Sequence, residues 1–272
     1  MGFFNWSAKN KLSPTFDWGI HIDIHNHILP ALDDGSSDIL TSHILLDGLQ
    51  ELGFSSSIST PHIALGLYHN DLNGIQQSYE FLKDSMPKTQ TDYDSIDLES
   101  DINPIMSKSV QTASPKNMLH GFAAEYMLDD QFFHLIEKGL ITYPSEAQYV
   151  LVEFPYLGKP HQWHEMVFEM HKSGYQPILA HPERYQFITP EYLMQKLMHA
   201  GFKFQLNLLS LSGYYGPKIK ACADLYLKEG VYQFAGTDMH HSFHLEALRK
   251  MKQDEKISAK LSDYTFQNEL LF

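Results

Sequence analysis

Residues 21–35 read HIDIHNHILPALDDG and place three histidines and three aspartates in fifteen positions beside several isoleucines. Side chains of a β-strand alternate between its two faces, so Ile22 and Ile24 fall on one face, which we expect to turn toward helices. The opposite face is then polar, which is unusual for a buried strand unless it lines a polar site. The segment therefore predicts a strand with this inward-facing set: His21, Asp23, His25 and His27.

The two histidines at the end of this strand suit metal binding. His25 and His27 lie two residues apart on one side of the chain, close enough to bind one or two divalent ions. Asp33 and Asp34 follow in the next loop, which can fold back over the histidines. For this segment alone, hydrogen-bonded core histidines are the alternative interpretation.

Apolar strand-like runs alternate with amphipathic helix-like runs along the rest of the chain. Helix-like runs cover residues 37–53, 161–174, 189–201 and 216–230. Strands separated by helices pair in parallel through right-handed crossovers, which leaves an open doubly wound sheet or a closed barrel. The predicted strands are 21–28, 54–62, 121–128, 149–155, 176–183, 203–211 and 232–240.

Most of these strands end in a side chain that can bind a metal ion. One such side chain is weak support, but parallel strands direct their carboxyl ends to one face, where active sites form. About nine donors, counted with those of the first strand, are too many for one ion and suit two or three. The strand-end residues are His62, Glu125, Glu153, His181, Asp238 and His240.

Mixed imidazole and carboxylate donors without thiolates favour Mn²⁺, Fe or Zn²⁺ over Ca²⁺. Arg184 follows the His181 strand end by three residues and can hold a phosphate with two hydrogen bonds. An ion pair with the neighbouring Glu183 is the alternative for this arginine. Asp23 precedes His25 on the same face, and we expect it to orient the ligands.

Composition excludes several classes of protein. The formal net charge of −13 argues against binding to nucleic acid or to anionic membranes. No stretch is long and apolar enough to span a bilayer, so a cytoplasmic location is expected. Cys222 is the single cysteine and lies in a helix-like run without the phosphate-binding loop of a cysteine phosphatase, so burial on a helix face is expected.

We expect a single domain over residues 20–272, preceded by an extension at residues 1–19. Residues 85–117 are polar and aperiodic, and they predict a long insertion, either a plain surface loop or a substrate lid. Tyr68 and Tyr126 are candidates for an aromatic rim at the site, with ordinary packing as the alternative.

Six segments, taken in order, resemble the motifs of the polymerase-and-histidinol-phosphatase (PHP) superfamily. They are DIHNHILPALDDG, STPH, AEYML, LVEFP, LAHPERY and GTDMH. Within it they are most similar to the CpsB-type protein-tyrosine phosphatases that bacteria encode with capsule and exopolysaccharide genes. The resemblance runs from about residue 20 to residue 255.

The resemblance implies a distorted, TIM-like (β/α)₇ barrel with a trinuclear metal centre, most often of Mn²⁺. It also implies that Arg184 binds the phosphoryl group, and that the substrate is the phosphotyrosine tail of a tyrosine autokinase controlling polysaccharide export. The ligand positions carried over by the motifs are His25, His27, Asp34, His62, Glu125, Glu153, His181, Asp238 and His240.

One departure concerns a second phosphate-binding arginine that some relatives carry shortly after the last ligand. Here the next arginine is Arg249, so either His241 or His244 takes its place or the phosphate is held more weakly. Two other functions remain open: a small-molecule phosphatase of the histidinol-phosphatase type, and a binding module without activity.

Overall fold

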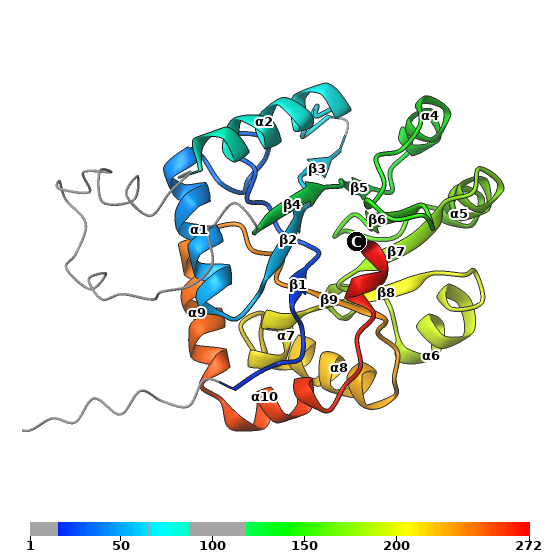
Figure 1. The fold of residues 1–272 in the computed structure, drawn as a ribbon. Coiled ribbons are helices and arrows are strands. Elements are labelled where there is room, and N and C mark those ends of the chain that lie inside the picture. Colours follow the sequence, from blue (N-terminus) through cyan, green and yellow to red (C-terminus); the bar gives the residue numbers. More distant parts are fainter. Residues whose placement is uncertain (1–15, 65, 87–117) are drawn as a thin grey trace, which may run out of the picture.

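The computed structural model describes residues 16–64, 66–86 and 118–272. Strands gather at the centre and helices surround them (Figure 1). The strands are β1 (Ile22–Asp23), β2 (Ser56–Ser59), β3 (His62–Ile63), β4 (Leu119–Phe122), β5 (Glu125–Met127), β6 (Tyr149–Glu153), β7 (Gln176–Ala180), β8 (Lys203–Asn207) and β9 (Phe234–Gly236).

The helices alternate with the strands as the amphipathic runs predict. Several begin at residues suited to helix N-termini: the Asp38 side chain accepts a hydrogen bond from the Thr41 amide at 2.9 Å, and Pro217 opens another helix. The helices are α1 (Ile39–Glu51), α2 (Leu72–Ser85), α4 (Phe132–Lys138), α5 (Trp163–Lys172), α6 (Pro190–Tyr192), α7 (Leu208–Ser212), α8 (Pro217–Lys228), α9 (Ser242–Lys252) and α10 (Glu255–Ser262). Shorter turns are η2 (Pro182–Arg184), η3 (Leu193–Leu197) and η4 (Asn268–Leu271).

Every strand pairing in the described residues is parallel. The strands form two sheets, with the orders β1-β2-β4 and β3-β5-β6-β7-β8-β9. Two of the predicted strands, 54–62 and 121–128, are therefore each divided in two. Their first halves, β2 and β4, lie in one sheet, and their second halves, β3 and β5, lie in the other.

Hydrogen bonds between the segments that directly follow β1 and β9 close the ring. The Asp238 amide donates to the His25 carbonyl at 2.7 Å, and the His27 amide donates to the Met239 carbonyl at 2.9 Å. The fold is therefore the predicted closed barrel and not the open sheet.

The predicted runs are longer than the strands that they contain, and two of them differ from the prediction in more than length. The run 203–211 is a strand only to Asn207, whose side-chain oxygen accepts a hydrogen bond from the Leu209 amide at 3.0 Å and so caps α7. The run 21–28 is a strand only over β1, and the expected facing was wrong: Ile22 and Ile24 turn into the barrel, and His21 is exposed.

The core has two parts. A large cluster fills the space between strands and helices, and it includes Trp18, which is 1% exposed. A smaller cluster lies inside the ring, and Leu271 from η4 completes it. Figure 1 shows this red C-terminal turn lying over the centre of the strands. The members on the strands and their loops are Ile22, Ile24, Ile58, Ala123, Tyr143, Leu151, Ile178, Ala180 and Phe234.

The predicted domain boundaries fall partly on residues outside the described ranges. Ser85 ends α2 and Met86 is buried, while residues 87–117 of the expected insertion lie outside the description. The same holds for residues 1–15 of the expected N-terminal extension. The single-domain division and the role of the insertion stay predictions.

Candidate metal centre

His25 and His27 leave the end of β1 and are completely buried. Their Nε2 atoms lie 3.4 Å apart. Each Nδ1 atom has its own partner: Gln205 Oε1 at 2.9 Å from His25, and Asp33 Oδ2 at 2.7 Å from His27. When Nδ1 donates to an oxygen, Nε2 carries the lone pair, so both rings present a ligand atom to the same space.

Glu125, the first residue of β5, lies at the centre of the polar group. Its Oε2 is 3.1 Å from His25 Nε2, 3.3 Å from His27 Nε2 and 3.3 Å from His62 Nε2. Its other oxygen, Oε1, is 3.2 Å from His181 Nε2. One buried carboxylate thus contacts four imidazoles from three segments of the chain.

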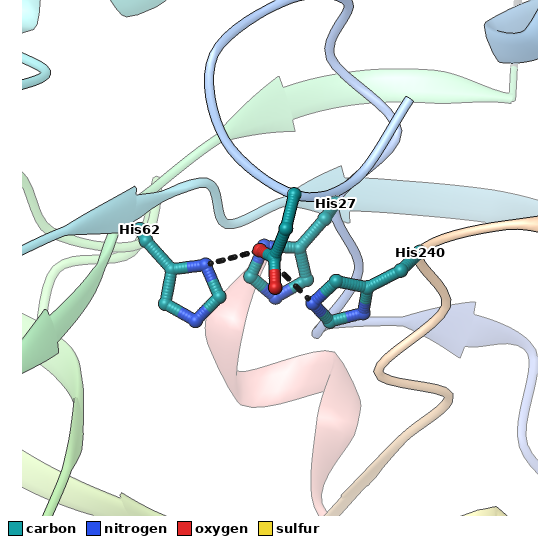
Figure 2. Close-up of side chains that lie close together, drawn as sticks. His27, His62 and His240 are labelled. Carbon is teal, nitrogen blue, oxygen red and sulfur yellow. Dashed lines mark ion pairs between the residues drawn. The ribbon is translucent and has the colours of Figure 1, made fainter. Parts of the chain in front are cut away.

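A loop residue covers one side of the group. Asp34 Oδ1 lies 3.4 Å from His62 Nδ1 and 3.6 Å from His240 Nε2. The His27 ring lies between His62 and His240 in Figure 2, and it stacks on His240 with 3.9 Å between ring centroids. The Asp34 side chain is 57% exposed, so the group opens to solvent on this side.

Three sets of side chains in the described residues place one ligand atom each within 4.8 Å of one another. Shared members join the sets, so neighbouring ions can be bridged. Eight of the nine predicted ligands belong to these sets, and the ninth, His181, contacts Glu125 beside them. The sets are His27, Asp34, His62 and His240; His25, His27, Glu125 and Asp238; and His62, Glu125 and Glu153.

Burial and neighbouring charges move the acidic groups in opposite directions. Burial of Glu125 opposes ionisation, but the adjacent His25 and the hydrogen bonds of the imidazoles outweigh it and hold its pKa well below the usual value. Glu153 has burial and the charge of Glu125 acting together, and its pKa rises to about 8. Such crowding of buried acids is what a bound cation relieves.

Two buried atoms support the same fit. Within the described residues His181 Nδ1 makes no hydrogen bond, and Glu125 Oε1 lies 3.2 Å from His181 Nε2 without good hydrogen-bond geometry. Buried polar atoms are seldom left unsatisfied. The donor types, imidazole and carboxylate oxygen, suit divalent transition metals. The residues present therefore fit a site for more than one divalent ion.

The backbone is strained where it delivers two of these side chains. His181 has φ +36° and Asp238 has φ +51°, both in the left-handed region that residues other than glycine seldom adopt. Strain of this kind concentrates at functional sites. It places both side chains at the edge shared with Arg184.

Arg184 lies beside the polar group with its charge already paired. Its Nη1 is 2.6 Å from Asp238 Oδ2, and its Nη2 donates to the Tyr156 hydroxyl. The guanidinium also lies over the Tyr215 ring, 4.5 Å from the centroid. The alternative partner, Glu183, points elsewhere and accepts from the Asn207 amide and from the Ser210 and Tyr232 hydroxyls at 2.8–3.0 Å.

Asp23 is buried, and it bonds to residues next to the proposed ligands instead of to the ligand side chains. It accepts hydrogen bonds from the Thr237 hydroxyl at 2.7 Å, the Thr237 amide at 2.9 Å and the Asn26 side chain at 2.9 Å. Burial raises its pKa to about 6. Its influence on the ligands therefore passes through Thr237, next to Asp238, and through the His25 amide at 3.5 Å.

Three residues hold ligands in place without having been predicted to do so: Gln205 and Asn207 were not singled out in the sequence, and Asp33 was named only as part of the loop that can fold over the histidines. Asp33 accepts from His27 and from the His62 amide at 2.8 Å, although only its neighbour Asp34 was expected to act. Gln205 and Asn207 contact His25 and Asp238. The signal for Asp33 was its adjacency to Asp34, whereas the two amides gave no signal in a run dominated by leucine.

The remaining candidates are the two tyrosines predicted as an aromatic rim and the histidine considered as a substitute for a second arginine. The Tyr126 hydroxyl accepts from the Ile141 amide at 2.7 Å and the ring is buried in the large core, so the rim interpretation was wrong for it. Tyr68 stacks on His62 with 5.2 Å between centroids. Burial lowers the pKa of His244 to about 4, which favours a neutral imidazole over an arginine-like cation.

The fold and site together define a PHP-type barrel. A solved structure from a study of YwqE from Bacillus subtilis and CpsB from Streptococcus pneumoniae, described there as unique metal-dependent tyrosine phosphatases, matches with a TM-score of 0.65 at 24% identity. The match covers 90% of this chain and 96% of the other.

The family model for capsular polysaccharide synthesis, CpsB/CapC, matches residues 21–96 and 90–265, and the chain belongs to this family. Tyrosine-protein phosphatase YwqE of Bacillus subtilis is 26% identical over 239 residues, covering 86% of this chain and 84% of that protein. Tyrosine-protein phosphatase CpsB of Streptococcus pneumoniae is 24% identical over 226 residues, covering 81% and 83%. No helix among the described residues is long and apolar enough to cross a membrane.

Proposed function

We propose that this chain is a metal-dependent protein-tyrosine phosphatase of a capsular polysaccharide locus. Membership of the CpsB/CapC family and similarity to proteins named tyrosine-protein phosphatases support this function. The observation that carries it is the double role of Asp238. One of its oxygens faces His25 and His27 at 3.3 and 3.5 Å, and the other binds Arg184 at 2.6 Å.

The centre is proposed to hold two or three divalent ions, with Mn²⁺ preferred and Fe or Zn²⁺ as alternatives. Overlap among the three ligand sets supports more than one ion. The proposed ligands are His25, His27, Asp34, His62, Glu125, Glu153, His181, Asp238 and His240. Asp33 and Gln205 would fix the rings of the first two histidines.

Bound divalent ions would supply electrophilic stabilisation of the phosphoryl oxygens and a water-derived nucleophile at neutral pH. Arg184 adds a positive charge at the edge of the same group, where it can donate to equatorial phosphoryl oxygens as negative charge develops. The Tyr156 and Tyr215 rings hold its guanidinium in place. A phenolate is a good leaving group, so the mechanism needs little proton donation from the protein.

The proposed substrate is a phosphotyrosine in the tail of a tyrosine autokinase that controls polysaccharide export. A small-molecule phosphatase acting on histidinol phosphate is the second candidate, because the same ligands and the same arginine would serve it. The single PHP domain over residues 20–272 and the cytoplasmic location belong to the same proposal.

The test compares phosphate release from a phosphotyrosine peptide and from histidinol phosphate, with Mn²⁺ present and with Mn²⁺ chelated. We expect turnover of the peptide that the chelator abolishes and that Mn²⁺ restores. Turnover of histidinol phosphate alone would keep the metal centre and replace the substrate. No turnover of either by a chain with confirmed bound metal would favour a binding module.

A further inference from the structure

Strand β8 ends at Asn207 without a proposed metal ligand, unlike the strands β7 and β9 that pair with it, which are followed by His181 and Asp238. What it contributes at that position is a pair of amides. Gln205 and Asn207 lie two residues apart, so they share one face of β8, and both are completely buried. Buried side-chain amides need partners, because an unpaired buried polar group costs free energy.

Gln205 bonds to the first ligand histidine. Its Oε1 lies 2.9 Å from His25 Nδ1 and 3.4 Å from the backbone amide of His181. Accepting from Nδ1–H selects the tautomer in which the His25 Nε2 lone pair faces Glu125 and Asp238. The carbonyl of Gln205 also accepts from the His181 amide at 2.9 Å, so this residue connects β8 to β7 and to the end of β1.

The neighbouring strand leaves room for this contact. A Cβ atom on Gly236 of β9 would lie 2.6 Å from His25 Cβ and 3.1 Å from Gln205 Nε2. Any residue larger than glycine would therefore push the two side chains apart. The contact between His25 and Gln205 depends on three segments of the chain.

Asn207 bonds to the proposed ligand Asp238, which follows the neighbouring strand β9. Its Nδ2 donates to Asp238 Oδ2 at 2.8 Å, beside the bond from Arg184, and to the Tyr215 hydroxyl at 3.2 Å. This leaves Asp238 Oδ1 directed toward His25 and His27. Neutral amides orient ligands without adding charge to a group that already holds several buried carboxylates.

We propose that Gln205 and Asn207 are positioning residues of the metal centre, Gln205 for His25 and Asn207 for Asp238. This inference rests on the metal centre proposed above and adds two residues that do not touch the ions. Residues that orient metal ligands typically change metal affinity by about 10–100-fold when they are replaced.

The test for Gln205 is Mn²⁺ titration of the full, chelator-stripped chain in competition with a chromophoric chelator. We expect Gln205→Met, which matches the length but cannot accept from Nδ1–H, to weaken Mn²⁺ binding by about 10–100-fold. Gln205→Glu restores an oxygen acceptor, so it should bind Mn²⁺ more tightly than Gln205→Met despite the added charge. If Gln205→Met does not fold, Gln205→Asn withdraws the acceptor by one methylene and carries the same expectation.

Gln233 supplies a matched control. Its side chain accepts from the Phe204 amide at 3.0 Å and donates to the Val231 carbonyl at 3.0 Å, away from every proposed ligand. We expect Gln233→Met to lower stability and leave Mn²⁺ affinity unchanged. Equal affinity in Gln205→Met and the wild-type chain would overturn the role of Gln205.

For Asn207 the matched pair is Asn207→Ser and Asn268→Ser. Serine keeps the cap on α7 but is too short to reach Asp238. Asn268 is a buried amide at the other end of the barrel, where it donates to the Ile22 and Ala235 carbonyls. We expect Asn207→Ser alone to weaken Mn²⁺ binding, by about 10-fold or more.

These titrations need no turnover, so they separate this inference from the proposed function. A wild-type chain that binds no Mn²⁺ would overturn the metal centre itself. A wild-type chain that binds Mn²⁺ no more tightly than either β8 variant would overturn only the positioning role.

Discussion

The two ends of the barrel interior use the same strand faces for opposite chemistry. In β6, Leu151 belongs to the apolar cluster, and Glu153, two residues later, belongs to the polar group. Ala123 and Glu125 repeat this change on the adjoining segment. The apolar end is filled and covered by Leu271, whereas the polar end opens beside Asp34. The apolar end therefore helps to bury Glu153, and burial is the main cause of its raised pKa. The polar end holds the proposed metal ligands.

Metal removal should separate the two ends most strongly. Chelation should reduce hydrolysis of a phosphotyrosine peptide to background, because the polar end loses its electrophiles. The strand ladder should survive, because the apolar cluster does not depend on ions. Phosphate release and circular dichroism, measured on the same sample, check both halves. Unchanged turnover in chelator would remove the metal from the mechanism.

Arg184→Ala should lower kcat/KM by roughly 100-fold, the scale for losing one donor to developing charge. Mn²⁺ affinity should fall far less than kcat/KM, because Asn207 still donates to Asp238. Arg249→Ala is the control, since Arg249 pairs with Glu51 and Glu246 on the outside of the barrel. Loss of metal from Arg184→Ala would show that the arginine supports the ligands instead of the phosphate.

Leu271→Ala tests the apolar end. Its side chain is fully buried, and truncation should cost about 2 kcal/mol of unfolding free energy, measured by denaturant titration. Activity per folded molecule and Mn²⁺ affinity should not change. A loss of activity beyond the unfolded fraction would mean that the two ends are coupled more tightly than their separate clusters imply.

Asp23→Asn acts at the boundary between the ends and should have a smaller effect. An amide cannot accept all the hydrogen bonds that Thr237 and Asn26 now donate, which should cost about 1 kcal/mol of stability. Because Thr237 precedes Asp238, a modest loss of Mn²⁺ affinity should accompany it. Full metal content with full activity would remove Asp23 from the site.

Cys222→Ser should have the smallest effect. Cys222 is half-buried on α8 and packs against the large core, so we expect stability within about 0.5 kcal/mol of wild type and unchanged turnover. Phosphate release from the phosphotyrosine peptide provides the measurement. Loss of turnover would revive a cysteine nucleophile.

Apolar runs and strand-end histidines and carboxylates are local patterns, so they allowed prediction of a parallel α/β array and of which strand ends carry donors. The closed barrel was predicted only from the resemblance to the PHP motifs. The division of strands 54–62 and 121–128 was not predictable, because it depends on which neighbours each half pairs with. Helix α7 was missed because an apolar run does not distinguish strand from buried helix. The amides of Gln205 and Asn207 gain their meaning only from partners far away in sequence.

Closure of the ring brings together residues from nearly opposite ends of the chain. Asp23 and Thr237, which bond across this seam, are 214 positions apart in sequence. Contacts of such long range pay the entropy of closing a large loop before they contribute, and they slow folding. On the ribosome, the seam must wait until β9 has emerged, when most of the chain has been synthesised. The polar group is thus completed late in folding, so Mn²⁺ added during refolding should bind in the slowest phase.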